Sequence, residues 1–110
     1  MHLEGKCKLL KIYISEDSKY KGHALYHAIV LKLRELGLAG ATVVRGIEGF
    51  GHEKRLHTAR IFDASLSLPV VVEVVDLPEK IENAIKEIKP MLNEGLMILA
   101  DVEVVKYGKN

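Results

Sequence analysis

A glycine-rich, basic segment near the middle of the chain contains the residue types needed to hold an anion. Gly46, Gly49 and Gly51 fall within six residues and follow a short β-type run. Glycines let backbone N–H groups approach a ligand closely, because no side chain intervenes. Four basic residues accompany them in the sequence, namely Arg45, Lys54, Arg55 and Arg60. Several converging amide and cationic donors are what a phosphate group requires.

The spacing of these residues leaves two interpretations open. It matches neither the Walker pattern nor the dinucleotide fingerprint, because the glycines follow a strand and do not open a helix. The glycines could bind phosphate, or they could only bend the chain while the charges keep a mobile loop hydrated. The polar connection, at about 50–67, is longer than the usual connection of about 4–6 residues, and such loops are often functional or disordered.

Other reactive residue types offer weaker candidates. His23 and His27 are four residues apart, a spacing that can place two imidazoles on one metal ion. By helical angle they lie opposite the expected core stripe, so a surface or interface pair is the better interpretation. His52 and His57 in the loop can contact phosphate or a partner, or be solvated. We expect no nucleophilic role for Cys7. Because no set of acid, base and nucleophile stands out, we also expect no enzymatic activity.

Apolar periodicity predicts the elements that must position these residues. Alternation over 8–15 predicts a strand. Apolar residues spaced at 3.6 over 22–36 predict a helix, which Gly37 ends. A second strand is expected over 41–45, and it can continue to Gly49.

The second half of the chain repeats this pattern. The valine run 69–75 predicts a central strand buried on both faces. Pro78 stands where a second helix begins, and Gly95 marks the end of that helical region. The last strand is expected over 96–106.

The order β-α-β-β-α-β predicts an α+β, ferredoxin-like domain spanning 1–110, with both helices on one face of an antiparallel sheet. On the other face we expect the apolar residues Leu9, Tyr13, Val71, Val75, Met97 and Leu99. They share that face with Lys11, Glu73, Asp101 and Glu103. A face this apolar is typical of an oligomer interface.

Composition narrows the class of protein. The chain has 110 residues, of which 48% are hydrophobic and 28% are charged, and its net charge is +1. This length fits one globular domain. The apolar content and balanced charge exclude a disordered segment, and the absence of a basic excess argues against a dedicated nucleic-acid binder. The single cysteine excludes an intrachain disulfide and fits a reducing compartment. No run approaches the length of a membrane span. We therefore expect a cytoplasmic protein that neither inserts into membranes nor binds nucleic acid.

Four segments together resemble an uncharacterised prokaryotic family of PII-like proteins: Leu9 to Ser15, Arg45 to His52, Leu68 to Asp76 and Ala100 to Val105. The resemblance covers nearly the whole chain, and its most specific part is the run Arg-Gly-x-x-Gly-Phe-Gly-His at 45–52. It implies a ferredoxin-like protomer and a homotrimer whose open sheet faces turn inward. It also implies an adenine nucleotide in the clefts between protomers, and a flexible T-loop after the second strand that docks on a target transporter, channel or enzyme.

The resemblance implies particular binding residues as well. Gly46, Gly49, Phe50 and Gly51 would form the base of the loop beside the nucleotide. The candidate phosphate contacts are Arg45, His52, Lys54 and Arg55. Lys106 and Tyr107 would approach from the last strand.

Two departures from the PII pattern refine the expectation. The segment 90–95, where PII proteins have a basic, glycine-rich loop, contains no lysine or arginine, which favours AMP or ADP over ATP. No tyrosine lies between Tyr26 and Tyr107, so we expect no uridylylation. The alternative is a divalent-metal-binding trimer resembling the CutA family, which would use histidines such as His23, His27, His52 or His57.

Overall fold

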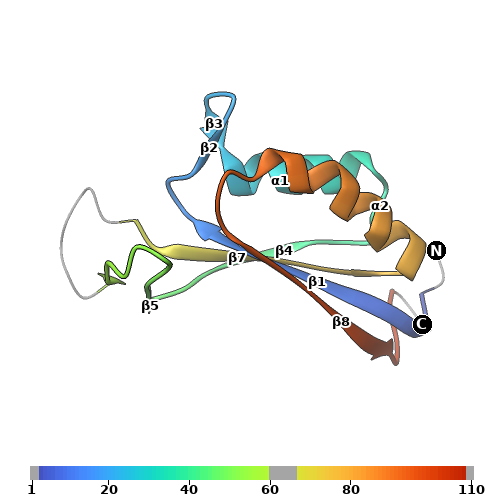
Figure 1. Ribbon diagram of the computed structural model, residues 1–110. Helices are drawn as coiled ribbons and strands as arrows, with labels where there is room; N and C mark the ends of the chain where they lie inside the picture. The colour runs from blue at the N-terminus through green and yellow to red at the C-terminus, as the bar shows by residue number, and fades with distance from the viewer. Residues whose placement is uncertain (1–2, 60–66, 109–110) are drawn as a thin grey trace.

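A four-stranded antiparallel sheet with two helices on one face forms the body of the protein (Figure 1). The computed structural model describes residues 3–59 and 67–108. Its elements are β1 Gly5–Ser15, β2 Lys19–Tyr20, β3 His23–Ala24, α1 Leu25–Glu35, β4 Thr42–Arg45, β5 Glu48–Gly49, β6 His57–Thr58, β7 Pro69–Asp76, α2 Pro78–Ile88, a 3-10 turn Lys89–Met91, and β8 Leu96–Val104. The main sheet has the order β4-β7-β1-β8, and β2–β3 and β5–β6 form two small hairpins.

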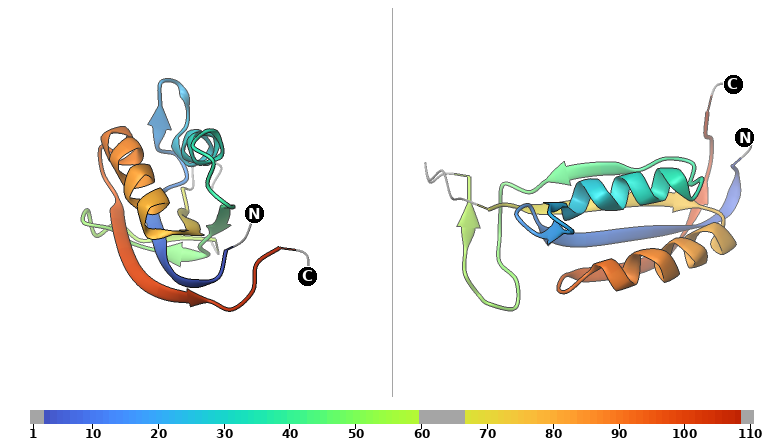
Figure 2. Two further views of the ribbon diagram at one scale, coloured as in Figure 1. Left: turned by 90° about the vertical axis from the view of Figure 1, so that its right-hand side faces the viewer. Right: turned by 90° about the horizontal axis from the view of Figure 1, so that it is seen from above.

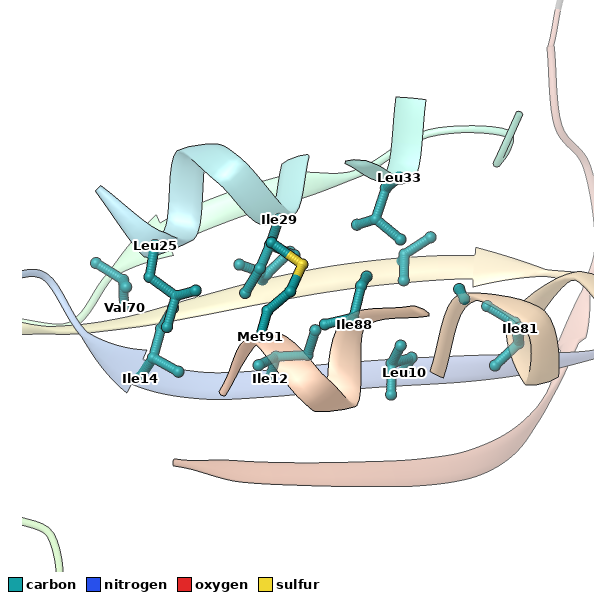
Figure 3. Close-up of a cluster of buried hydrophobic side chains, with 13 residues drawn as sticks. Leu10, Ile12, Ile14, Leu25, Ile29, Leu33, Val70, Ile81, Ile88 and Met91 are labelled. Atoms are coloured by element: carbon teal, nitrogen blue, oxygen red, sulfur yellow. The ribbon is translucent and has the colours of Figure 1, made fainter. Parts of the chain in front are cut away.

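The core lies between the sheet and the two helices, as Figure 3 shows. Alternate residues of β1 and β7 point at the helices. In β1 this alternation produces the apolar period of two from which the strand was predicted. The buried cluster consists of Leu10, Ile12, Ile14, Leu25, Ile29, Leu33, Val70, Val72, Val74, Ile81, Ala84, Ile88 and Met91. Full burial of one such Leu, Ile or Val side chain contributes about 1.5–3 kcal/mol, so this layer supplies the main driving force for folding.

Gly37 and Pro78 mark helix ends as the sequence predicted, whereas the second helical region ends at Met91 and not at Gly95. Gly37 follows α1 with φ of +80°, a left-handed conformation that favours glycine, and its N–H donates to the Arg34 carbonyl over 3.1 Å. Pro78 occupies the first turn of α2. The α+β, ferredoxin-like prediction is confirmed.

Several predicted element bounds also differ from those of the structure. Residues 22–24 belong to the β2–β3 hairpin and not to α1, because Lys21 and Gly22, with φ of 50° and 82°, make a tight turn before the helix. The second strand ends at Arg45, and Glu48–Gly49 forms the separate strand β5. The last strand ends at Val104 and does not reach residue 106.

Strand β7 is central, as predicted, but it is not buried on both faces. Val70, Val72 and Val74 are buried against the helices, whereas Val71 and Val75 on the opposite face are only half-buried. The helices cover one side of the sheet, so only one face of this strand is enclosed by the chain itself.

The side-chain directions predicted for β8 were reversed. Met97 pairs with Ile12 and Leu99 pairs with Leu10, and directly opposed residues of neighbouring strands share a face. Met97, Leu99, Asp101 and Glu103 therefore lie on the helix side of the sheet. The prediction failed because both alternating sets are apolar over 96–100, so only the register with β1 decides which set faces outward.

The open face of the sheet is nevertheless apolar, as the sequence indicated. The register places on it Leu9, Tyr13, Val44, Val71, Val75, Leu96, Ile98 and Ala100. We call this set the open-face patch. An ion pair between Lys11 Nζ and Glu73 Oε2, 3.4 Å apart, lies among them.

In the described ranges, no helix combines the length and apolar character needed to span a bilayer.

Candidate functional site

Three segments distant in the sequence meet at one end of the sheet, beside the start of the long loop (Figure 1). They are the end of β1, the end of β4 and the start of β7. The Gly46 N–H donates to the Pro69 carbonyl over 2.7 Å, and the Glu16 N–H donates to the Leu68 carbonyl over 2.8 Å. We call residues 15–17, 45–51 and 67–69 together the loop base.

Two of the predicted glycines are needed for packing at the loop base. A Cβ atom on Gly46 would lie 2.9 Å from Pro69 Cγ, and one on Gly49 would lie 3.1 Å from the same atom. Their close neighbour is thus the Pro69 ring, which gives them a structural reason to be glycine. A Cβ atom on Gly51, in contrast, would meet open space, so this backbone is accessible to a ligand.

The long loop begins with an ordered hairpin. In β5–β6, Glu48 pairs with Thr58 and Gly49 pairs with His57. The Ala59 N–H donates to the Ile47 carbonyl over 2.8 Å. The expected irregular connection at about 50–67 therefore contains a strand pairing, and Arg60 lies outside the described residues.

The predicted basic residues of the loop base have different surroundings. The Arg45 guanidinium forms an ion pair with the Glu16 carboxylate, although its side chain stays 62% exposed. Lys54 has φ of 64°, and its Nζ lies 5.7 Å from the centre of the exposed Phe50 ring. Arg55 and His52 are also exposed. Arg45, Lys54 and Arg55 thus present positive charge to solvent along the first part of the long loop.

A polar cluster at the loop base was missed by sequence reasoning. The Ser15 hydroxyl donates to Asp17 Oδ1 over 2.7 Å and lies 2.5 Å from the hydroxyl of buried Ser67. The hydrogen bond from Ser15 chiefly lowers the pKa of Asp17, and the Ser67 hydroxyl and the nearby His57 lower it further. Serines and an aspartate form no recognisable spacing here, since Ser67 is 52 residues from Ser15.

The predicted histidines are distributed over β3, α1 and the long loop. His23 and His27 are exposed on β3 and α1, and His57 belongs to the β5–β6 hairpin. His52 instead approaches Glu94, with 4.0 Å between Nδ1 and Oε2. Glu94 lies in the connection from α2 to β8, and no local sequence pattern indicates that it meets the loop.

Two predicted binding residues lie far from the loop base of the same chain. Lys106 and Tyr107 follow β8, whose end is opposite the long loop, as the right-hand view of Figure 2 shows. The Tyr107 hydroxyl donates to the Ala39 carbonyl over 2.6 Å, and the Ala39 N–H donates to the buried carboxylate of Asp76 over 2.8 Å. One chain alone therefore does not assemble the whole predicted set.

Sequence comparisons find relatives over almost the whole length. The model of the DUF190 family, described as "Uncharacterized ACR, COG1993", matches residues 7–104. A UPF0166 protein of Aquifex aeolicus is 45% identical over 100 residues, which cover 91% of this chain and 94% of the relative. Another UPF0166 protein, from Methanocaldococcus jannaschii, is 38% identical over 92% of this chain and 94% of its own length.

Solved structures with a similar fold have little sequence identity to this chain. CPII from Thiomonas intermedia K12, bound to ADP and bicarbonate, superposes with a TM-score of 0.61 and 16% identity, covering 92% of this chain and 90% of CPII. The divalent ion tolerance protein CutA1 from Ehrlichia chaffeensis superposes with a TM-score of 0.56 and 10% identity, covering 94% and 86% of the two chains. At such identities these matches establish the fold.

Proposed function

Because the chain belongs to the DUF190 family of uncharacterised prokaryotic proteins and has the fold of CPII and CutA1, we propose that it is a PII-like regulatory protein. It binds an adenine nucleotide at the loop base and signals to a partner protein through the long loop. One observation carries the proposal: Arg45, the accessible backbone of Gly51 and the basic side chains of the loop are grouped at one end of a fold that holds ADP in CPII.

The donors at the loop base suit a phosphate group. The Arg45 guanidinium offers two parallel N–H groups in the geometry that phosphate oxygens accept. Gly51 supplies backbone without a side chain in the way, and Lys54 and Arg55 add positive charge that attracts the anion. We propose that these groups, with His52, contact the phosphates.

We propose that the binding unit is a homotrimer in which the open-face patches meet. Three apolar members of the patch are well exposed in the single chain, Val44 at 46%, Leu96 at 55% and Ile98 at 41%. Burying such a surface against other copies would remove it from water. A trimer would also let a neighbouring chain bring its Lys106 and Tyr107 to this loop base, which one chain cannot do alone.

Signalling would follow from linkage between the nucleotide and the loop. A nucleotide that contacts the loop base favours the loop conformations that make those contacts, and a partner that reads the loop then senses the nucleotide. Ile47, Phe50 and Leu56 are 78%, 64% and 57% exposed. Apolar side chains this exposed on one loop suit a docking contact with a protein, which we propose to be a transporter, channel or enzyme.

The nucleotide proposed is AMP or ADP. Residues 90–95 of the α2–β8 connection include no lysine or arginine, and this segment places the exposed carboxylate of Glu94 near His52. A third phosphate would bring more negative charge toward this carboxylate. The proposed role is regulatory and not enzymatic, and the proposed compartment is the cytoplasm.

Calorimetry with AMP, ADP and ATP tests this function. We expect saturable binding of AMP or ADP, loss of at least most of that affinity in Arg45→Ala, and no change in Arg34→Ala, an exposed arginine on α1. Well-folded protein that shows no heat at millimolar nucleotide would contradict the proposal. Binding of divalent metal without any nucleotide binding would favour the CutA-like alternative.

A further inference from the structure

Three potential metal ligands meet where the long loop approaches the α2–β8 connection. One ligand atom each from His52, Glu53 and Glu94 lies within 4.8 Å of the other two. His52 and Glu53 lie within the Gly51–Lys54 turn, which the hydrogen bond from the Lys54 N–H to the Gly51 carbonyl closes over 2.9 Å. Glu94 comes from a segment more than 40 residues away, so the fold and not local sequence brings the three together.

The charges in this cluster favour a cation. Two carboxylates this close repel each other. Throughout 3–59 and 67–108, neither Glu53 nor Glu94 forms an ion pair with a lysine or arginine, and the pair from Glu94 is with His52, which is charged only when protonated. The neighbouring Lys54 lies over the Phe50 ring. A divalent cation would relieve the repulsion between the carboxylates.

The ligand types indicate which cation fits. One imidazole nitrogen with two carboxylate oxygens suits a first-row transition ion such as Zn²⁺, whereas Mg²⁺ and Ca²⁺ prefer oxygen ligands alone. Ligand atoms lie about 2.0–2.2 Å from bound zinc. Since all three side chains are exposed, rotation of the side chains alone can bring their atoms from the present separation onto one ion.

We propose that His52, Glu53 and Glu94 form a binding site for a divalent transition cation that fastens the long loop to the α2–β8 connection. Three protein ligands leave coordination positions for water or for a ligand oxygen. The ion would restrict the loop to conformations that keep its 51–54 turn beside Glu94. A divalent cation would thus restrict the loop conformation in addition to the nucleotide. Binding of this cation does not require nucleotide binding.

Zinc titration of the nucleotide-free, full-length protein by calorimetry tests the site. We expect one ion per chain, with affinity at least about tenfold weaker in His52→Ala and in Glu94→Gln, since even outer-shell partners of a metal contribute about 10–100-fold. The matched controls are His27→Ala on α1 and Glu87→Gln on α2, both exposed in the wild type, and these should bind zinc as the wild type does. Absence of zinc binding, or equal affinity in the site variants and the wild type, would overturn the proposal.

Trypsin cleavage after Lys54 and Arg55 tests whether the cation holds the long loop against the α2–β8 connection. At a zinc concentration a few times the wild-type Kd, zinc should slow cleavage severalfold in the wild type and much less in Glu94→Gln. If zinc protected both proteins equally, Glu94 would not hold the loop and the proposal would be wrong. Both experiments omit nucleotide, so a failure here is distinguishable from a failure of the proposed function.

Discussion

Arg45 and Glu16 form an ion pair across the loop base, between the end of β4 and the residue that follows β1. The side chain of Glu16 is 23% exposed and that of Arg45 is 62% exposed, so the guanidinium remains open to solvent on its other side. A phosphate group that binds Arg45 must share or replace this carboxylate. The pair therefore keeps the proposed phosphate contact occupied when nucleotide is absent.

Glu16→Gln should strengthen nucleotide binding. The substitution removes the competing negative charge and leaves Arg45 in place, so we expect severalfold tighter ADP binding by calorimetry at low salt. The effect should shrink as salt rises, because an exposed pair is screened. Unchanged or weaker ADP binding in Glu16→Gln would show that Glu16 does not compete with the ligand.

Gly46→Ala should destabilise the protein. The added methyl group would lie 2.9 Å from Cγ of the rigid Pro69 ring, and overpacking of this kind costs about 1–3 kcal/mol. Urea unfolding measures the change in free energy. Gly51→Ala is the matched control, because its methyl group meets open space, and a surface change of this kind costs about 0.5 kcal/mol or less. Equal losses in the two variants would refute the packing role of Gly46.

Ile98→Asp should break the proposed assembly. It places a carboxylate in the open-face patch opposite Lys11, which already pairs with Glu73, so burial between copies would leave one carboxylate in excess and would cost several kcal/mol. The substitution leaves the helix-side core intact. Sedimentation equilibrium should show monomers for this variant and trimers for the wild type. Leu31→Asp on α1 is the control, since Leu31 and Ile98 are both 41% exposed. Loss of trimers in the control, or their survival in Ile98→Asp, would place the interface elsewhere.

Asp17 should contribute to the acid sensitivity of folding. The pKa of this carboxyl is below its ordinary value, chiefly because of the Ser15 hydroxyl. A group with a depressed folded-state pKa stabilises the fold above its unfolded pKa of about 3.9, and this contribution is lost as pH falls through the folded pKa. Urea unfolding from pH 6 down to pH 3 should show a shallower decline in Asp17→Asn than in the wild type. The exposed control Glu82→Gln should follow the wild type, and identical profiles for all three proteins would argue against the Ser15 contact.

Sequence periodicity predicted the elements that have one apolar side. The alternation in β1 and the apolar stripe of α2 each follow from burial against a single layer, so Ile12 and Ile81 could be assigned to the core directly. The β2–β3 and β5–β6 hairpins have strands of two residues. Strands that short have no period to detect, which is why Gly22 to Ala24 was assigned to a helix.

The candidate site was only partly predictable for a different reason. Arg45 and the glycines are close together in the sequence, so their proximity could be predicted without knowledge of the fold. Glu16, Ser67 and Glu94 reach the loop through strand pairing and the α2–β8 connection, and no local pattern marks them. Lys106 and Tyr107 lie at the opposite end of the sheet in the same chain, because β8 runs antiparallel to β1. Their approach to a nucleotide between protomers therefore stays a prediction about a neighbouring chain.

Amide chemical shifts recorded during an ADP titration of the ¹⁵N-labelled wild type test whether the nucleotide binds at the loop base, because they report both binding and its location. We expect saturable shifts at Gly46, Gly49 and Gly51, with little change along the exposed face of α1. An absence of shifts at millimolar ADP, or shifts confined to residues away from the loop base, would contradict nucleotide binding at the loop base.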